Sequence, residues 1–206
     1  MITKRLIILI LLFSLLIIGS SCCKKTFYLF IDSSPITGIE VMVNDESSTT
    51  PFTIQNSKGV KCNISINSEQ FLDLEEWFPG IDTKAIFIEW LEHSTQYSTS
   101  NIIEIKDGKE LTSVFEIEYR LDYTEKFDNG AETQVDDKYS GWYGHRDIVE
   151  VIPENYDGFR FVGWEIQMSE ATVERLDEKL NLQSMFLTIN SPVILRALYE
   201  SKGELK

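Results

Sequence analysis

The sequence predicts a mainly β protein made of two tandem, small β-sandwich-like or β-grasp-like modules with one or two short helices. Short runs in which apolar and polar residues alternate recur along the chain, and turn residues separate them. Aromatic residues, at 12% of the chain, are spread along its length, as in strand-rich proteins. A Phe-x-x-Trp pattern occurs twice, at 87–90 and 161–164, and it predicts two copies of one unit.

Residues 1–21 are predicted to be a secretory signal peptide. Lys4 and Arg5 supply its positive start, the run 6–18 is almost wholly apolar, and small residues follow that run. Residues 22–26 then form a short tether in front of the first module. A chain with such a leader is carried to the outer side of the cytoplasmic membrane.

The cysteine pair after the small residues resembles the bacterial lipoprotein box. The resemblance implies that the peptide bond before Cys22 is cleaved and that its thiol is acylated, with Cys23 as the alternative. Two other outcomes stay open: residues 6–23 remain as an uncleaved membrane anchor, or the signal is cleaved without acylation. All three place the rest of the chain outside the cytoplasmic membrane, and the lipid-anchored form is expected on the extracytoplasmic face of the cell membrane or outer membrane.

The charge balance excludes one class of partner. The chain has 19 Lys and Arg against 33 Asp and Glu, a formal net charge of −14. Nucleic-acid binding relies on clustered basic residues, so no nucleic-acid partner is expected. The same excess disfavours electrostatic adhesion to anionic head groups, which leaves the N-terminal lipid as the expected contact with the membrane.

The first module is predicted over residues 27–118. A short helix is expected over 69–78, because Asn67, Ser68 and Gln70 form a capping signal at its start. Alternation and turn residues predict strands over 27–31, 39–43, 51–54, 60–66, 85–90, 101–105 and 111–115.

The second module is predicted over residues 119–200, with 201–206 as a tail. A second helix is expected over 169–181, where Val173 and Leu176 belong to a partial apolar stripe. The predicted strands cover 115–121, 149–152, 159–164, 185–189 and 193–199.

The two modules align at their ends. Residues 87–90 match 161–164, and Ser113-Val114-Phe115-Glu116 matches Ala197-Leu198-Tyr199-Glu200. Trp90 and Trp164 are therefore expected at equivalent, buried positions in two small cores. Period-2 alternation places the Phe and the Trp of each pattern on opposite strand faces unless a bulge intervenes.

Two stretches carry a family resemblance. Residues 157–164 and 187–199 resemble the divergent internalin-type B-repeat, a Listeria–Bacteroides-like repeat of bacterial surface proteins. Residues 31–43 and 49–54 resemble the leading part of the same repeats and also the PEGA-like surface β domain. The resemblance implies small β modules that serve as stalks, spacers or adhesive units, and it has no catalytic residues to carry over.

Residues that support catalysis are sparse, so no enzyme activity is expected. His93 and His145 lack metal-ligand partners at short spacing, and His145 with Asp147 amounts to half of a hydrolytic relay without a serine nucleophile motif. Cys62 alternates with apolar residues and is expected to be a small buried strand side chain. The sequence predicts no metal site and no cofactor.

Acidic residues crowd the start of the second module. The favoured interpretation is a solvated acidic face, and a calcium site is the alternative, although the spacing matches no EF-hand loop. The residues concerned are Asp122, Glu125, Asp128, Asp136 and Asp137.

Three aromatic residues form a cluster in a turn-rich segment of the second module. Tyr139, Trp142 and Tyr143 stand among glycines, where rings can stack on a glycan or anchor a protein. They can equally cap the open end of a small β core. The first alternative makes these three residues the candidate ligand-binding site.

The sequence therefore favours a non-enzymatic, lipid-anchored protein of the cell envelope that acts as a binding or spacer module. Its expected partners are an unidentified envelope protein or a glycan, and the binding surface is expected in the second module. The alternative function is an accessory subunit of an envelope transport or polysaccharide complex.

Overall fold

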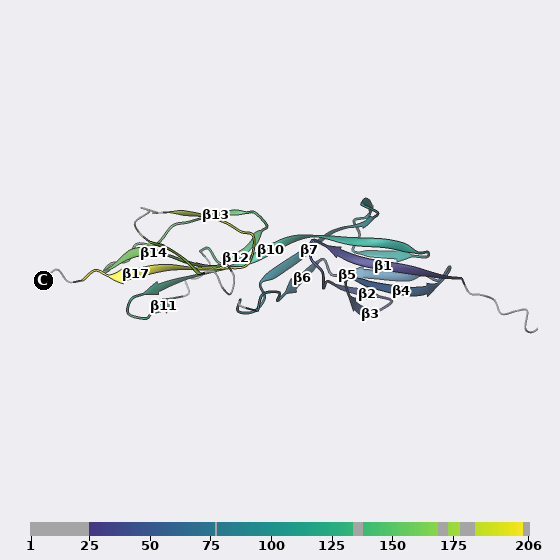
Figure 1. Ribbon diagram of the computed structural model, residues 1–206, viewed down its shortest axis with the longest axis horizontal. Coiled ribbons are helices and arrows are strands. Elements are labelled where there is room, and N and C mark those ends of the chain that lie inside the picture. Colours follow the sequence, from purple (N-terminus) through teal and green to yellow (C-terminus); the bar gives the residue numbers. More distant parts are fainter. Residues whose placement is uncertain (1–24, 77, 134–137, 169–172, 178–183, 204–206) are drawn as a thin grey trace, which may run out of the picture.

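The computed structural model describes residues 25–76, 78–133, 138–168, 173–177 and 184–203. Every regular element in these ranges is a β-strand. Figure 1 shows an elongated molecule in which two β modules lie end to end, with the start of β1 at one end and the end of β17 at the other. No helix long and apolar enough to cross a membrane occurs among these residues.

The strands alternate with short turns along both modules. In chain order they are β1 (Thr26–Ser34), β2 (Glu40–Val43), β3 (Glu46–Thr49), β4 (Phe52–Ser57), β5 (Cys62–Ile66), β6 (Glu69–Leu72), β7 (Thr83–Glu92), β8 (Thr95–Ser98), β9 (Ile102–Ile105), β10 (Lys109–Phe127), β11 (Glu132–Thr133), β12 (Gly141–Gly144), β13 (Ile148–Val151), β14 (Phe159–Gln167), β15 (Val173–Asp177), β16 (Met185–Thr188) and β17 (Val193–Ser201). The mainly β prediction is confirmed for this part of the chain.

The helix predicted over 69–78 is wrong. Residues Glu69–Leu72 form strand β6, which pairs antiparallel with β7. Gln70 does not cap a helix: its buried side-chain amide accepts from the backbone N–H of Glu40 and donates to the carbonyl of the same residue, at 3.0 and 2.8 Å. Pairing with a neighbouring strand outweighs the local capping signal here.

The second predicted helix, over 169–181, is also wrong where the structure describes it. Val173–Asp177 is strand β15, which pairs antiparallel with β14 and brings Leu176 opposite Trp164. Residues 169–172 and 178–181 lie outside the described residues.

A single strand joins the two modules. β10 is 19 residues long. Its first half pairs in parallel with β1, from Leu29 opposite Lys109 onward, and its second half pairs in parallel with β17, from Leu121 opposite Val193 onward. The boundary expected between residues 118 and 119 thus falls inside a continuous strand, and no flexible linker separates the modules.

The two modules repeat one strand order. Around the shared β10, the first module runs β4-β1-β10-β7-β8 and the second runs β12-β10-β17-β14-β15. β10 is therefore the counterpart of β17 in the first module and of β1 in the second.

The register repeats as well. Trp90 stands opposite Ser113, and Trp164 stands opposite Ala197, as the alignment of the two halves predicts. A register shift follows at the same place in both pairs, between Val114 and Phe115 in β10 and across Val162 in β14. Both copies therefore contain a bulge, which is the exception to strict alternation that the Phe-x-x-Trp spacing left open.

Each bulge turns the Phe of the pattern toward its Trp. The ring centroids of Phe87 and Trp90 lie 5.7 Å apart, and those of Phe161 and Trp164 lie 5.0 Å apart. Gly163 adopts a φ of 151° within the second bulge, in the region that favours glycine. The pattern is thus a bulge signature that aims two large rings into one core.

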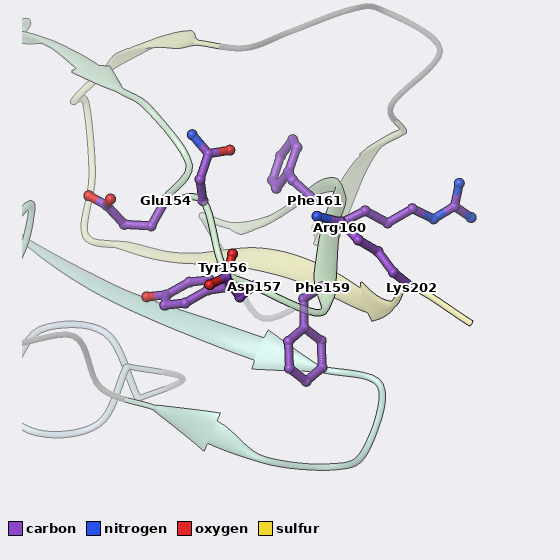
Figure 2. A pocket seen from close by; sticks show the side chains of 8 residues that line it. Glu154, Tyr156, Asp157, Phe159, Arg160, Phe161 and Lys202 are labelled. Carbon is purple, nitrogen blue, oxygen red and sulfur yellow. The ribbon is translucent and has the colours of Figure 1, made fainter. Parts of the chain in front are cut away.

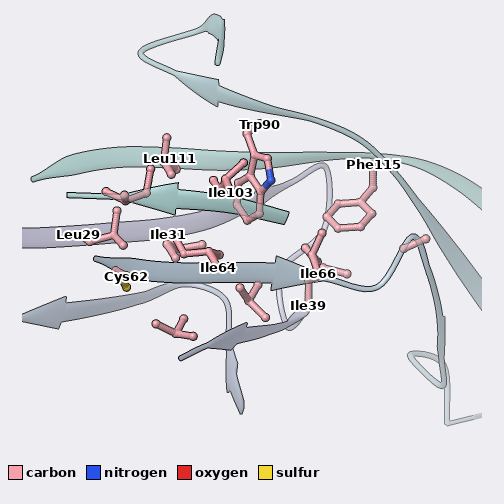
Figure 3. Close-up of a cluster of buried hydrophobic side chains, with 14 of the residues drawn as sticks. Leu29, Ile31, Ile39, Cys62, Ile64, Ile66, Trp90, Ile103, Leu111 and Phe115 are labelled. Carbon is pink, nitrogen blue, oxygen red and sulfur yellow. The ribbon is translucent and has the colours of Figure 1, made fainter. Parts of the chain in front are cut away.

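Two hydrophobic clusters correspond to the two modules. Trp90 is 0% exposed in the first cluster and Trp164 is 1% exposed in the second, so the prediction that both are central is confirmed. Figure 3 shows Trp90 in the first cluster, among aliphatic side chains from both of its sheets. Cys62 is a free, fully buried strand residue of the same cluster, as expected, and burial raises the pKa of its thiol.

The second sheets of the two modules differ. In the first module this sheet has the order β3-β2-β5-β9. In the second module it consists of β13 paired with β16, and no counterpart of β2 or β3 is present among the described residues.

Candidate functional site

The free end of the second module carries the candidate site. The N-terminal strand β1 begins at one end of the elongated molecule, and β17 ends at the other (Figure 1). We call the far end, formed by the ends of β10 and β17 and the turn before β14, the tip. A chain held by its N-terminus therefore presents the tip farthest from its attachment.

A pocket of about 280 Å³ lies at the tip. Figure 2 shows Glu154 and Tyr156 on one side of this pocket and Arg160 and Lys202 on the other. The remaining lining residues are Asn155, Asp157, Phe159 and Phe161. Acidic, basic and aromatic side chains thus surround one small, open site.

Ion pairs hold the charged rim of the pocket. Lys138 pairs with Glu154, and an Arg160 guanidinium nitrogen lies 3.0 Å from a carboxylate oxygen of Glu200. All four side chains are substantially exposed, so these pairs add little stability and can exchange partners with a ligand.

A buried carboxylate lies beneath the pocket. Glu125, on β10, is fully buried and accepts hydrogen bonds from the phenol groups of Tyr123 at 2.9 Å, of Tyr199 at 3.5 Å, and of Tyr156. The single hydroxyl proton of Tyr199 is shared with the backbone carbonyl of Glu154, which lies closer, at 3.0 Å. Through Tyr156 and Glu154, the network connects the interior to the pocket wall.

Burial and the neighbouring carboxylate keep these phenols protonated. Burial first, and Glu125 second, raise the pKa of Tyr123 and of Tyr199 well above the ordinary value for tyrosine. The same causes raise the pKa of Tyr156 to about 12. A protonated phenol is the form that donates to a carboxylate, so the network is stable at neutral pH.

The sequence missed this network. It grouped Glu125 with a solvated acidic face, whereas the residue is buried. The overlooked signal is the alternation of Leu121, Tyr123 and Glu125, which puts all three on the inner face of one strand.

The other acidic residues do not converge around Glu125. Asp122 pairs with Arg120 at 2.9 Å, and Asp128 accepts from the backbone N–H and the hydroxyl of Ser201 at 2.8 and 2.7 Å. No group of three or more His, Cys, Asp or Glu able to hold a metal ion occurs in the part of the chain that the structure describes. Asp136 and Asp137 lie outside that part.

The structure separates the three predicted aromatic residues. Tyr139 and Tyr143 pack against the second hydrophobic cluster, and the ring of Tyr139 lies 5.2 Å from that of Tyr123 in an edge-to-face contact. The Tyr143 hydroxyl donates to the Tyr139 carbonyl at 2.8 Å. This packing matches the core-capping alternative for both tyrosines.

Trp142 lies at the junction of the modules. It stands opposite Arg120 of β10, whose guanidinium carbon is 5.9 Å from the centre of the indole ring. The ring of Phe71, from β6, lies 5.7 Å from that of Trp142. Trp142 therefore makes its ring contacts at the junction, whereas Tyr139 and Tyr143 pack against the second cluster.

The histidines do not assemble a relay. An Asp147 carboxylate oxygen accepts from the backbone N–H of Gly144 at 2.8 Å, and the ring of His145 contacts Tyr119 edge-on at 6.1 Å. His145 also lines a cavity of about 410 Å³ at the junction, together with Ile36 and Phe115. His93 is exposed, with a ring nitrogen 3.9 Å from a carboxylate oxygen of Glu110.

Comparisons with known proteins leave the family of this chain open. No family model matches the chain, and no curated protein matches it. The resemblance to internalin-type B-repeats and to the PEGA-like domain therefore stays a prediction. Among solved structures, the chain is similar to the major pilin protein T-13 from Streptococcus pyogenes serotype GAS131465. That likeness has a TM-score of 0.31 and 8% identity, and it covers 86% of this chain and 97% of the pilin, which is too weak to support an inference about function.

Proposed function

We propose that this chain is a non-enzymatic, lipid-anchored protein of the cell envelope. It acts as a stiff spacer that holds its tip away from the membrane. The N-terminal lipid on Cys22, or on Cys23, attaches it to the cell membrane or outer membrane on the extracytoplasmic side. An envelope protein or a glycan binds at the tip pocket.

The single observation that carries the proposal is the shared strand β10. Two modules joined by an ordinary linker rotate against each other. Here one strand belongs to both sheets, and it pairs with β1 at one end and with β17 at the other. Bending at the junction would break ladder hydrogen bonds of the same strand, so the pairing supports a rigid unit.

The dimensions also suit a spacer. A strand rises about 3.3 Å per residue, so the 19 residues of β10 alone span roughly 60 Å. β1 and β17 extend in parallel with its two halves, and the termini point away from each other (Figure 1). Most of the described length therefore separates the attachment point from the tip.

The tip supports a binding role at the far end. Its pocket combines charged groups with Tyr156, and a polar, partly aromatic site of this kind suits a glycan or a charged peptide. The hydrogen-bonded carboxylate of Glu125 holds the pocket wall through Tyr156.

Rigidity tests the spacer function directly. Spin labels on the exposed residues Lys25 and Lys202 are expected to give one narrow distance distribution by pulsed electron resonance. An insertion of six residues, alternating Gly and Ser, between Ile117 and Glu118 should broaden this distance distribution strongly. The same insertion in the turn at Asn129 is the matched control and should leave it narrow, because that turn lies beyond the junction.

Two outcomes would contradict the proposal. A broad distribution in the unmodified chain would exclude a stiff spacer. Attachment is tested separately: the intact mass of the chain from the membrane fraction should match a chain that begins at Cys22 or Cys23 and carries a lipid. A mass that still includes Met1 and no lipid would point to the uncleaved anchor instead.

A further inference from the structure

In the second sheet of each module, two strands correspond: β16 and β13 of the second module match β9 and β5 of the first. β9 pairs with β5, and β16 pairs with β13, with the same alternation of buried and exposed residues. Ile102 and Phe186 stand at corresponding places and are 64% and 67% exposed. β13 is therefore the counterpart of β5, with Val149 in the place of Ile64.

The two sheets differ at the opposite edge of these strands. β5 pairs with β2 on the side away from β9, and Val41, Met42 and Val43 of β2 stand opposite Ile66, Ser65 and Ile64. In the second module the described strands between β10 and β13 are β11 and β12, which pair with β10 instead. No strand among the described residues pairs with this edge of β13.

The backbone of β13 offers hydrogen-bonding groups to that edge. Ile189 N–H donates to the Asp147 carbonyl at 2.9 Å. Every second residue after Asp147, which means Val149 and Val151, therefore points its N–H and C=O groups toward β16. In an antiparallel ladder the bonding side alternates, and the N–H and C=O groups of Ile148 and Glu150 therefore face the open edge.

The first module shows the same geometry with the edge filled. Asn63 is the counterpart of Ile148, and its carbonyl accepts from the N–H of Asn44 at 2.9 Å, just beyond β2. In the second module the Tyr139 hydroxyl covers only the far end of the edge: it donates to the Ile152 carbonyl at 3.2 Å and accepts from the Ile152 N–H at 3.0 Å. Within the described part of the chain, no strand pairs with Ile148 or Glu150 from this side.

We propose that the open edge of β13 binds an extended segment of a partner protein. The segment runs antiparallel to β13, in the place that β2 takes in the first module. It adds a strand through main-chain hydrogen bonds to Ile148 and Glu150.

The chemistry of the occupant follows from β2 and from the charge of the edge. In β2, Val41 and Val43 are buried and Met42 between them is half-buried, so apolar residues are expected along the segment. Beside the edge, Ile148 is 68% exposed on the outer face, which favours a second apolar contact there. Glu150 is the residue opposite the middle position, and it favours a basic side chain at the place of Met42.

A second copy of this chain suits the edge less well. In a contact of only a few residues, it would bring its own Glu150 close to the Glu150 of the first copy, and the two carboxylates would repel each other. It would also bring a second net charge of −14. A basic and apolar strand from another protein avoids both penalties.

The test uses a peptide based on β2. The probe is a synthetic peptide with the sequence of residues 38–46 carrying Met42→Lys, added to the isotope-labelled chain from Lys24 onward. We expect the amide signals of Ile148 and Glu150 to shift and their hydrogen exchange to slow. The matched control peptide is N-methylated at positions 42 and 44, whose N–H groups would face β13, and it should bind at least tenfold more weakly.

Two variants of the chain complete the test. Glu150→Pro removes one edge N–H without touching the ladder to β16, and it should weaken peptide binding at least tenfold. Glu104→Pro makes the same change on the exposed edge of β9 and should leave binding unchanged. If Glu150→Pro fails to fold, Glu150→Lys replaces it: that variant should prefer the peptide carrying Met42→Glu over the one carrying Met42→Lys.

Three outcomes would overturn the proposal. The peptide leaves Ile148 and Glu150 unperturbed at millimolar concentration, or N-methylation makes no difference. Alternatively, the chain dimerises on its own and Glu150→Pro abolishes the dimer, in which case a second copy occupies the edge. None of these outcomes bears on the stiffness of β10, which the spin-label distances report separately.

Discussion

The rings of Phe71 and Trp142 lie 5.7 Å apart, although Phe71 belongs to β6 of the first module and Trp142 to β12 of the second. On one side of β10, β7 pairs with β10 and β6 pairs with β7. On the other side, β12 pairs with β10 directly. The pair therefore closes the junction on the face where Lys84 and Glu118 also form an ion pair at 2.9 Å.

This contact should couple the two modules energetically. Phe71→Ala and Trp142→Ala, measured singly and together by urea unfolding, are expected to show a coupling energy of about 0.5–1.5 kcal/mol, because tilted aromatic pairs contribute that much beyond area burial. A control cycle pairs Phe71→Ala with Tyr97→Ala, whose ring lies by Lys109 instead. If both cycles give a coupling energy near zero, the ring contact does not stabilise the junction.

The two tryptophans at the bulges should behave as a matched pair. Trp90→Ala and Trp164→Ala are each expected to lower the free energy of unfolding by about 3–5 kcal/mol, because both side chains are fully buried. Neither indole N–H has a hydrogen-bond acceptor among the described residues. Trp90→Phe and Trp164→Phe should therefore lower the free energy of unfolding clearly less than the Ala variants do. Phenylalanine keeps an aromatic ring in the core and removes a buried, unsatisfied donor.

The same variants test cooperativity. Because β10 belongs to both sheets, each Trp variant should shift one unfolding transition that both modules share. Fluorescence and far-ultraviolet circular dichroism should report the same midpoint. Two separate transitions, of which a given variant moves only one, would mean that the modules unfold independently.

The sequence predicted the repeat because its signal is local and redundant. The spacing from Phe87 to Trp90 and the match of Ser113 with Ala197 were enough to predict the paired positions, whereas the bulges were only an alternative to strict alternation. The two helices were wrong for the opposite reason. An apolar stripe or a cap near Gln70 does not show that β7 offers a free edge, and that edge decides the structure of residues 69–72.

The candidate site was harder to predict than the fold. Glu125 stands among other acidic residues in sequence, and only the topology shows that Tyr156 and Tyr199 reach it from the turn before β14 and from β17. The sequence likewise grouped Tyr139 with Trp142. Tyr139 lies in the loop before β12, whereas Trp142 lies within β12, where successive side chains point to opposite faces of the sheet.

The tyrosine network should make the protein sensitive to alkali. Tyr156 has its pKa raised from 10.0 to about 12 in the folded state, and those of Tyr123 and Tyr199 are raised further. A group whose folded pKa is raised stabilises the fold fully below its unfolded pKa and loses that contribution as the pH rises through the folded value. The free energy of unfolding should therefore fall from about pH 10 upward.

Two measurements check the alkaline prediction. Urea midpoints taken below and above pH 10 should show the loss of stability, and the ultraviolet absorbance of phenolate should show that part of the 8 tyrosines ionise late or only on unfolding. In Tyr156→Phe the decline near the pKa of Tyr156 should be smaller. An unchanged midpoint up to pH 12, with all tyrosines ionising together near pH 10, would contradict the buried network.

Glu125→Gln probes the centre of the network without changing its shape. The carboxylate accepts from three phenols, whereas an amide keeps one acceptor oxygen and turns an NH₂ donor toward a phenol that is itself a donor. We expect a loss of about 1–3 kcal/mol in the free energy of unfolding, the usual cost of unsatisfied buried polar groups. Glu116→Gln, an exposed change on the same strand, is the control and should stay within about 0.5 kcal/mol of the unmodified chain.

The double variant Glu125→Gln with Tyr156→Phe identifies the cause of that loss. Tyr156 donates to the carboxylate oxygen opposite the one that Tyr123 contacts, so removing its hydroxyl relieves the donor facing the new amide. Part of the lost stability should return relative to the sum of the single changes. The corresponding position in the first module is Ser33, whose hydroxyl bonds to Thr50 and to the Ile36 carbonyl. The fold itself thus accepts a small neutral residue there, and a Glu125→Gln variant as stable as Glu116→Gln would show that the carboxylate is dispensable for the tip.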